Sequence, residues 1–329
     1  MFRGTTAGWK STPRTTMRRR LCASAAVVAA AALSALQPAG AHAAPICGGP
    51  GGGPRLVGVV PGAALEGLTV DAAGRAYTTD LLSGQVYRID RPGAAALPIV
   101  QVPGSAGGLA WAPDGTLLVG YGPAASVPLG DAARAYSVGR INIATTAFGP
   151  WAHGLSASNG LDVAGNGIVY ATNDFATQIG RVYPNGFVQP NWGTVPSANG
   201  AVLGKGDRWL YVSRTFVNPG VSRVSTANPR IVQSLLDLGG NITAGPDGLT
   251  LDTQDRPVVP FNGSGEIVRI NTPGSYCVLA SGLPGSSVLS YGRGTRGFAA
   301  GHLYRAGFDG RVYEIPRGFD KGSTAAIPG

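Results

Sequence analysis

The stretch AGPDGLTLD (residues 244–252) places an Asp-Gly pair directly before an alternating apolar run. By itself, an Asp-Gly pair is a common signal for a hairpin turn. The same arrangement occurs three more times with a different oxygen-bearing residue before the glycine, in ALEGLTVD (64–71), ASNGLDV (157–163) and SANGAVL (197–203). Four occurrences in one chain indicate a structural repeat rather than four unrelated turns.

Each repeat is anchored by a glycine that precedes a short apolar strand. The anchors are Gly67, Gly108, Gly160, Gly200 and Gly248, and the successive spacings are 41, 52, 40 and 48 residues. Further short strands and turns follow each anchor, as in GTLLVGYG (115–122), and a sixth, looser unit ends near Pro316. Six units of four short strands with almost no helical periodicity predict an all-β fold, a six-bladed β-propeller. A two-sheet sandwich does not explain a repeat of this length.

The sixth unit lacks a fourth strand. PRLVGVVP (54–61) lies before the first unit and is the expected replacement, which would close the ring and remove an exposed edge. We therefore expect the following division of the chain: 1–43 signal peptide, 44–60 N-terminal segment with the closing strand, 61–318 propeller, and 319–329 C-terminal tail.

The first 43 residues have the features of an export signal. A basic run, Arg18 to Arg20, precedes the apolar stretch LCASAAVVAAAALSAL (21–36), and Ala41-His42-Ala43 is a small-x-small cleavage site. The sequence predicts a secreted, extracellular protein with no membrane association after the signal is removed. It leaves open whether the general secretory or the twin-arginine route is used.

Removal of this segment changes the charge and the cysteine count. It carries six basic and no acidic residues, so the net charge falls from +9 to 26 − 6 − 17 = +3, and no basic cluster remains to favour a nucleic-acid partner. Cys22 is lost with it, which leaves Cys47 and Cys277 as an even pair in an exported protein. We expect one disulfide between them, closing a loop for which chain entropy predicts a stabilisation of about 4 to 5 kcal/mol.

The residues before the anchor glycines should meet at the axis of the propeller, because the first strand of each blade lines the central channel. They are Glu66, Gly107, Asn159, Asn199 and Asp247, with Ser287 in the sixth unit. Carboxylate and carboxamide oxygens without His or Cys are the ligands that Ca²⁺ prefers. Facing carboxylates would also repel each other without a cation. The pattern therefore predicts a Ca²⁺ site.

The pattern EGL, SNGL, ANGAV and PDGLTLD on six units resembles the senescence marker protein/gluconolactonase family, to which paraoxonase and diisopropyl fluorophosphatase are related in architecture. The resemblance spans about residues 61–316 and is specific at the channel positions. It implies a central Ca²⁺ held by Glu66, Asn159, Asn199 and Asp247. It also implies a catalytic role for Asp247 as general base or nucleophile. Gly107 departs from the polar residues that lactonases of this family have in the second blade.

Other polar residues at strand ends are candidates for the mouth of the channel. We predict substrate contacts from Asn173, Arg214 and Asn262, each of which ends a second strand; Asp174 follows Asn173. These residues could equally cap strands. The long segment 123–136 in the second blade is either a lid or an ordinary surface loop. His153 and His302 do not lie at a blade entrance, and structural roles are favoured for both.

The leading hypothesis is a monomeric, secreted, Ca²⁺-dependent hydrolase that acts on a small-molecule lactone or related ester. The alternative is a non-catalytic propeller that Ca²⁺ stabilises while its loops bind a glycan, a peptide or a small molecule. A third possibility, a non-hydrolytic enzyme of the strictosidine-synthase type, needs a Glu base in the channel, for which Glu66 is the only candidate.

Overall fold

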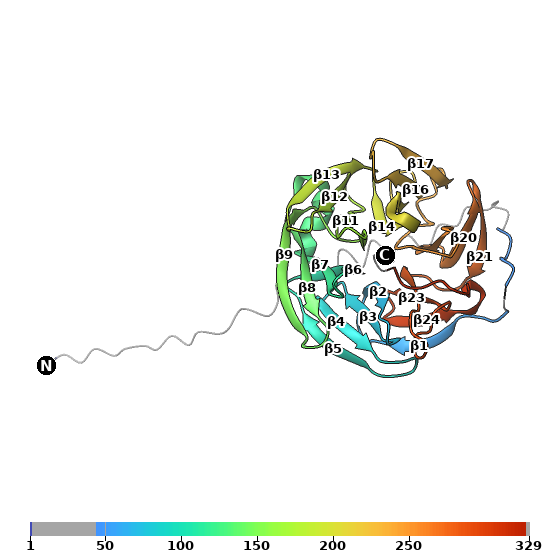
Figure 1. Cartoon of the computed structure of the whole chain (residues 1–329), viewed down its shortest axis with the longest axis horizontal. Coiled ribbons are helices and arrows are strands. Elements are labelled where there is room, and N and C mark those ends of the chain that lie inside the picture. The colour runs from blue at the N-terminus through green and yellow to red at the C-terminus, as the bar shows by residue number, and fades with distance from the viewer. Residues whose placement is uncertain (2–43, 50, 327–329) are drawn as a thin grey trace.

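The computed structural model describes Met1 and residues 44–49 and 51–326, and almost all of its regular structure is β-strand. Six four-stranded antiparallel sheets are arranged in a ring around a central axis (Figure 1). The predicted six-bladed propeller is therefore confirmed. The signal-peptide prediction falls, apart from Met1, outside the described residues. No helix in the described part of the chain is long and apolar enough to cross a membrane.

The strands run in sequence order from the axis outward in blades 1 to 5. Blades 1 and 2 contain β2 (Leu65–Val70), β3 (Ala76–Asp80), β4 (Gln85–Ile89), β5 (Ala96–Gln101), and β6 (Ser105–Trp111), β7 (Leu117–Gly122), β8 (Tyr136–Asn142), β9 (Ala147–Leu155). Blades 3 and 4 contain β10 (Leu161–Val163), β11 (Val169–Ala171), β12 (Gln178–Val182), β13 (Val188–Thr194), and β14 (Ala198–Leu203), β15 (Trp209–Arg214), β16 (Gly220–Ser225), β17 (Val232–Asp237).

Blade 5 contains β18 (Thr250–Leu251), β19 (Pro257–Phe261), β20 (Glu266–Thr272) and β21 (Ser275–Ala280). Blade 6 contains β22 (Ser286–Tyr291), β23 (Leu303–Gly307), β24 (Arg311–Ile315) and, as its outer strand, β1 (Arg55–Val59). β1 pairs antiparallel with β24, with Arg55 opposite Glu314 and Val59 opposite Arg311. The predicted closure of the ring by the N-terminal strand is thus confirmed. Short 3-10 segments occur at η2 (Ala124–Ala132), η3 (Lys205–Asp207) and η4 (Pro316–Gly318).

The hydrophobic core is divided among the interfaces between neighbouring blades. One cluster joins Val138 and Leu155 of blade 2 to Leu161 and Val169 of blade 3, all of them buried. Because each blade buries one face against the blade before it and the other against the blade after it, its strands are apolar on both faces near the axis. This explains the short continuous apolar runs in the sequence.

The anchor glycines are where adjacent inner strands come closest. A Cβ atom at Gly67 would lie 2.7 Å from the carbonyl oxygen of Gly107, one at Gly108 would lie 2.6 Å from that of Asn159, and one at Gly160 would lie 2.4 Å from that of Asn199. None of the five anchors has a positive φ, so they are not hairpin-turn glycines. The repeat uses glycine because the backbone of the next blade occupies the space of a side chain.

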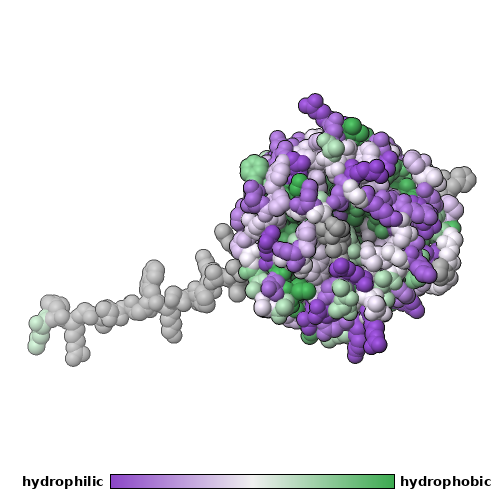
Figure 2. Space-filling model, viewed as in Figure 1, coloured by the Kyte–Doolittle hydropathy of each residue, from purple (hydrophilic) through white to green (hydrophobic). Residues whose placement is uncertain are grey.

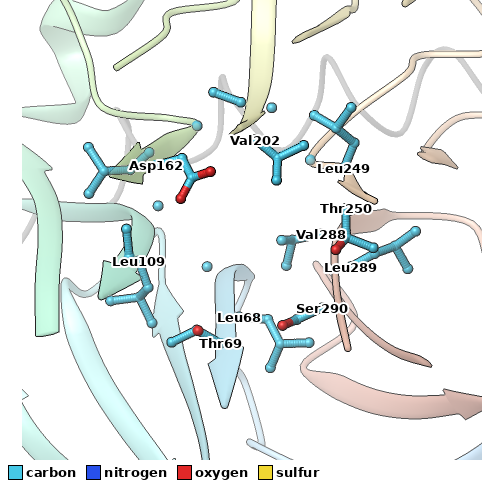
Figure 3. Close-up of a pocket in the computed structure, with 18 of the residues that line it drawn as sticks. Leu68, Thr69, Leu109, Asp162, Val202, Leu249, Thr250, Val288, Leu289 and Ser290 are labelled. Carbon is cyan, nitrogen blue, oxygen red and sulfur yellow. The ribbon is translucent and has the colours of Figure 1, made fainter. Parts of the chain in front are cut away.

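The inner strands enclose a narrow channel, with a cavity of about 70 Å³ that extends from Glu66 to Ser290. Figure 3 shows inner-strand side chains around it, with the carboxylate of Asp162 directed inward. A second cavity of about 400 Å³ lies at the end of the channel away from Glu66, and the segment 322–326 lines it. The described chain thus ends near the centre of the ring (Figure 1), on a disc whose visible face carries mainly hydrophilic residues (Figure 2).

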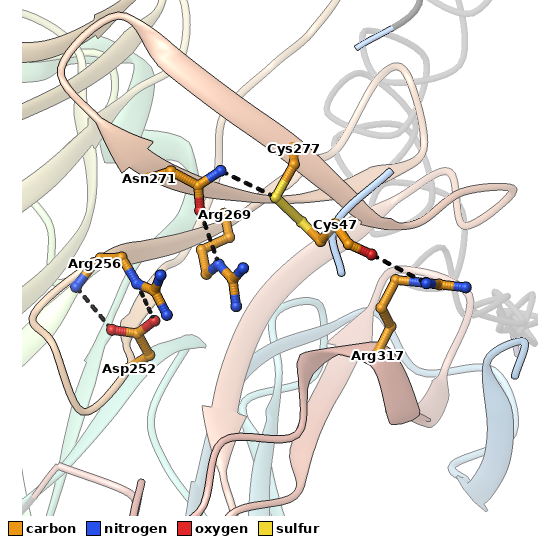
Figure 4. The surroundings of a disulfide bond; sticks show 7 residues. All are labelled: Cys47, Asp252, Arg256, Arg269, Asn271, Cys277 and Arg317. Carbon is orange, nitrogen blue, oxygen red and sulfur yellow. Dashed lines mark hydrogen bonds and ion pairs between the residues drawn. A yellow bond between two sulfur atoms is a disulfide. The ribbon is translucent and has the colours of Figure 1, made fainter. Parts of the chain in front are cut away.

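Cys47 and Cys277 form a disulfide, with an S–S distance of 1.99 Å and a sequence separation of 230 (Figure 4). The segment around Cys47 also adds to the outer edge of blade 5: the Cys47 amide donates to the Val278 carbonyl (2.9 Å) and the Val278 amide donates to the Pro45 carbonyl (2.8 Å). Since Cys47 precedes β1 in the sequence, this covalent bond ties the outer strand of blade 5 to the segment that leads into the closing strand.

Candidate metal and active site

The four predicted ligands lie at the same end of the channel. Glu66 and Asn199 belong to inner strands, whereas Asn159 and Asp247 lie just before theirs. Glu66, Asn199 and Asp247 are each at most 6% exposed. We call this group of four residues, together with Asp174, the carboxylate ring.

β-bulges aim the side chains of this group. The pairing register shifts between Leu65 and Leu68 in β2 and between Ala198 and Ala201 in β14, so the bulges contain Glu66-Gly67 and Asn199-Gly200. A bulge puts two residues opposite one and redirects a side chain that regular alternation would place elsewhere. The glycine thus permits close approach of the blades, and the bulge turns the preceding residue toward the axis.

Asp174 supplies a third carboxylate at this end of the channel. It follows β11, its charge acts on both Glu66 and Asp247, and its Oδ1 accepts a 3.4 Å hydrogen bond from Nδ2 of Asn159. Burial raises the pKa of Asp174 to about 6, and hydrogen bonds from its own backbone and from Asn159 oppose the shift. The sequence placed Asp174 only at the end of a strand and gave no signal that it joins the other acids.

Asp247 is held by two hydrogen bonds. Its Oδ1 accepts from the amide of Gly248 (2.9 Å) and its Oδ2 accepts from Nδ2 of Asn262 (3.0 Å). Burial and, after it, the charge of Asp174 raise the pKa of Asp247 to about 8, although the donors on Gly248 and Asn262 and the nearby amide of Asn199 oppose the shift. The side chain of Asn262, predicted to contact substrate, therefore orients Asp247 in this structure.

Glu66 is the least well satisfied acid of the group. Burial raises the pKa of Glu66 well above its usual value, and the charges of Asp247 and Asp174 add to this effect. Its Oε2 is buried without a hydrogen-bond partner among the described residues, as is Oδ1 of Asn199. Buried unpartnered oxygens are rare and costly in folded proteins, so two of them beside mutually repelling carboxylates call for a compensating ligand.

A cation fits this donor set. No group of three or more His, Cys, Asp or Glu side chains within residues 44–49 and 51–326 is arranged so that it could hold a metal ion on its own. A site here would therefore need the carboxamide oxygens of Asn159 and Asn199 as well as the carboxylates. Such a set of charged and neutral oxygen donors is typical of Ca²⁺ sites. The unpartnered oxygens of Glu66 and Asn199 are the atoms that a bound ion would satisfy.

Asn173 and Arg214 make other contacts. Asn173 is buried, and it accepts a hydrogen bond from the Phe175 amide (2.9 Å) and donates one to the Val127 carbonyl (3.3 Å). Nη2 of Arg214 donates to the carbonyl of Leu236 (3.0 Å) on the outer strand of blade 4. Within the described residues, neither side chain forms a hydrogen bond to the carboxylate ring, so their substrate-binding roles stay predictions.

The segment 123–136 is attached to blade 3. Besides the bond from Asn173 to Val127, Asp131 accepts hydrogen bonds from the Thr177 amide (2.8 Å) and from its hydroxyl (2.6 Å), and Nη1 of Arg134 donates to the Pro190 carbonyl (3.0 Å). These bonds anchor the segment to blade 3 in this structure, and its role as a lid or a surface loop stays a prediction.

Blade 2 supplies no side chain at the ring position, because Gly107 packs against the Ser158 carbonyl. Blade 2 does place a titratable group within the influence of the ring, Tyr136, whose hydroxyl is hydrogen bonded to that of Ser105. Burial raises the pKa of Tyr136, and the charges of Glu66 and Asp174 contribute. Both histidines of the described residues have partners elsewhere: Nδ1 of His153 contacts Ser137 (2.7 Å) and Nδ1 of His302 contacts Glu314 (2.8 Å).

Comparison with known proteins rests on structure. Neither a protein-family model nor a curated protein matches the sequence. The structure is similar to that of a gluconolactonase from Xanthomonas campestris, with 15% identity and a TM-score of 0.63 over 85% of this chain and 99% of that one. It is also similar to the calcium-binding protein regucalcin from Agrobacterium tumefaciens, with 18% identity and a TM-score of 0.65 over 87% of this chain and 99% of that one.

The chain has the propeller fold of gluconolactonases and regucalcin. A third similar structure is virginiamycin B lyase from Staphylococcus aureus, with 17% identity and a TM-score of 0.53 over 80% of this chain and 88% of that one. Hydrolases and lyases thus share this architecture, and the chemistry of any one member must be argued from its site.

Proposed function

We propose that the protein is a secreted, Ca²⁺-dependent hydrolase of a lactone or a related ester. The observation that carries this proposal is the carboxylate ring: three buried acids with raised pKa values stand beside two carboxamides, and acceptor oxygens on Glu66 and Asn199 lack partners. The fold shared with gluconolactonases supports a small-molecule substrate. The disulfide and the export signal expected at residues 1–43 support secretion.

Glu66, Asn159, Asn199 and Asp247 would hold the ion, with Asp174 adding charge. When bound, Ca²⁺ supplies positive charge that polarises a substrate carbonyl and lowers the pKa of the neighbouring carboxyl groups. Asp247 is the residue we assign to the chemical step. It either takes the proton from an attacking water molecule or attacks the carbonyl carbon itself.

The hydrogen bonds of Asp247 fit that role. The Gly248 amide and Asn262 each hold one of its two oxygens, which fixes the plane of the carboxylate. Each oxygen keeps a lone pair for a proton or for bond formation. Asn262 thereby acts as a positioning residue.

The test is hydrolysis of a panel of lactones and aryl esters by Ca²⁺-saturated protein. Asp247→Asn should lower kcat/KM by about 10³-fold, in the range found for loss of a general base or nucleophile. Asp114→Asn is the matched control, since Asp114 lies in the β6–β7 turn with a 56% exposed side chain, and it should behave as the unchanged protein. Unreduced turnover by Asp247→Asn in the calcium-replete state would falsify the assignment.

Two alternatives give different results. A non-catalytic Ca²⁺-stabilised binder is favoured by Gly107, which leaves blade 2 without a ring side chain. It predicts that a chelator lowers Tm although no substrate is turned over. A lyase is the other possibility. Virginiamycin B lyase loses its activity when one histidine is replaced by alanine. In this chain the two described histidines contact Ser137 and Glu314 and not the carboxylate ring, which does not favour a lyase of that kind.

A further inference from the structure

Large apolar side chains line part of the channel opening at the end that holds the carboxylate ring. In each antiparallel blade the inner strand begins at this face, and the second and fourth strands end there. The loops that follow the second strands β7, β11 and β15 and the fourth strand β17 therefore lie on the same face as Glu66 and Asp174. Five exposed apolar residues belong to these loops. We call them the apolar rim; they are Leu129 (61% exposed), Phe175 (50%), Phe216 (38%), Val217 (49%) and Ile242 (46%).

The apolar rim is continuous with the site through adjacent residues. Phe175 directly follows Asp174, and Phe216 directly follows Thr215. The Thr215 hydroxyl accepts a hydrogen bond from Nδ2 of Asn199 (3.0 Å) and donates one to the Pro246 carbonyl (2.7 Å), next to Asp247. The two phenylalanine rings contact each other across the blade boundary, with centroids 5.0 Å apart.

The backbone holds these aromatic residues in place. The Phe175 amide donates to Oδ1 of Asn173 (2.9 Å), and the Phe216 amide donates to Oγ of Ser197 (2.8 Å). A Cβ atom at Gly130 would lie 2.4 Å from the Phe175 carbonyl oxygen, so η2, which carries Leu129, packs directly against this loop. A surface fixed in this way loses little conformational entropy when it binds a ligand.

The opposite mouth of the channel has a different character. Its cavity is lined by charged residues, including Asp207, Asp255, Lys205 and Arg293. Clusters of exposed apolar residues are uncommon on soluble proteins and mark binding sites. Since the cluster lies at the end of the channel that holds the candidate metal site, its occupant should be part of whatever that site binds.

We propose that the apolar rim binds the apolar part of the substrate, so that the preferred substrates are lactones or esters with a large alkyl or aryl group and not polyhydroxylated lactones. This proposal rests on the hydrolase proposed above. It assigns Phe175 and Phe216 as specificity-determining residues, with the reacting carbonyl over the carboxylate ring and the substituent lying across blades 3 and 4.

The test uses a series of γ-lactones whose alkyl substituent grows from one to about eight carbons, and the lactams of the same series as unreactive ligands. For the unchanged protein, kcat/KM should rise by up to about fourfold per methylene while the chain remains on the rim. The double variant Phe175→Ser/Phe216→Ser should flatten this dependence. Phe187→Ser is the matched control and should leave the dependence unchanged. Phe187 is 63% exposed, but it lies on the turn between β12 and β13, where it packs against Tyr183 and not against the apolar rim.

The two series separate this proposal from the hydrolase proposal. Turnover that does not depend on chain length overturns the role of the rim and leaves the hydrolase standing. Chain-length-dependent lactam affinity that the double variant loses, without hydrolysis of any lactone, supports the rim and overturns the hydrolase. A dimer that the double variant converts into a monomer, with flat chain-length dependence, overturns the proposal by showing that a second copy covers the rim. Phe216→Leu, which keeps an apolar side chain, should retain most of the slope.

Discussion

The two ends of the propeller channel use buried aspartates in opposite ways. At the far end, Asp252 accepts hydrogen bonds from the Arg256 amide (3.0 Å) and Nε (2.7 Å), and Asp71 has the same two bonds with Arg75. At the near end, Glu66, Asp174 and Asp247 form no ion pair with an arginine or lysine within the described part of the chain. The same residue types therefore stabilise turns at one end and repel one another at the other.

The difference shows which buried acids are structural. An acid that pairs with the guanidinium four residues later is satisfied within its own blade, and the pairing is a property of the repeat. The acids of the carboxylate ring come from three blades and accept hydrogen bonds only from neutral groups among the described residues, so an added cation would offset their mutual repulsion. Acids maintained in this state at a stability cost are typical of functional sites.

The largest effect should come from Ca²⁺ itself. At a concentration 1,000 times Kd, the ion should stabilise the fold by about 4 kcal/mol, and each kcal/mol raises Tm by about 2–4 °C in a chain of this size. Calorimetry with added Ca²⁺ and with a chelator measures the difference. Glu66→Gln should lose most of it, whereas Glu266→Gln, the same change on the half-exposed start of β20, should keep it. Equal calcium shifts in both variants would contradict the assigned site.

Two Asp-to-Asn substitutions should change the free energy of unfolding in opposite directions when a chelator has removed Ca²⁺. Asp252→Asn breaks the ion pair between the buried Asp252 carboxylate and Arg256, whose side chain is 26% exposed, and should lower the free energy of unfolding by about 2 kcal/mol. Asp174→Asn removes a carboxyl whose pKa is raised to about 6, so its ionised form is disfavoured in the fold and the variant should be about 2 kcal/mol more stable at pH 8. Urea unfolding measures both. A loss of stability in both variants would mean that Asp174 is structural.

The fold could be predicted because the geometry of the axis constrains the sequence directly. Where neighbouring inner strands leave no space for a side chain, the sequence needs glycine, and this need recurs in five of the six blades, as at Gly67, Gly160 and Gly200. The closing strand followed from the missing fourth strand of the last unit. The positions of Glu66 and Asp247 followed from their register with the anchors, although their catalytic and ligand roles remain untested.

Residues on loops and long side chains could not be placed in this way. Asn173 is predicted to contact substrate, but its side chain is hydrogen bonded to its own loop and to segment 123–136. The next residue, Asp174, is the one that joins the acids. Nothing in strand periodicity fixes which of two adjacent loop residues turns inward. Arg214 has a side chain long enough to reach outward to β17. The tail, a bland run of small residues, carries no signal that Ala325 is buried at the channel end.

The last prediction concerns Asp162, the acid whose carboxylate is directed into the middle of the channel (Figure 3), and its measured quantity is a slope with pH. Burial raises its pKa to about 7 and Asp207 contributes, while hydrogen bonds from the amides of Leu203 (2.6 Å) and Val163 (2.9 Å) oppose the shift. Because the folded protein holds this proton more tightly than the unfolded chain, which releases it near pH 4, stability should fall as pH rises from about 4 to about 7.

Asp162→Asn removes this dependence. The substitution has a constant cost, since the asparagine amide group cannot accept one of the two backbone hydrogen bonds, so the comparison rests on the slope. Each pH unit between about 5 and 7 should shift the difference in unfolding free energy by up to about 1.4 kcal/mol in favour of the variant, with no further change above pH 8. Urea midpoints in excess Ca²⁺, where the carboxylate ring contributes equally to both proteins, measure this slope. Parallel stability curves would show that Asp162 is already ionised in the folded protein, and that the two amide donors outweigh its burial.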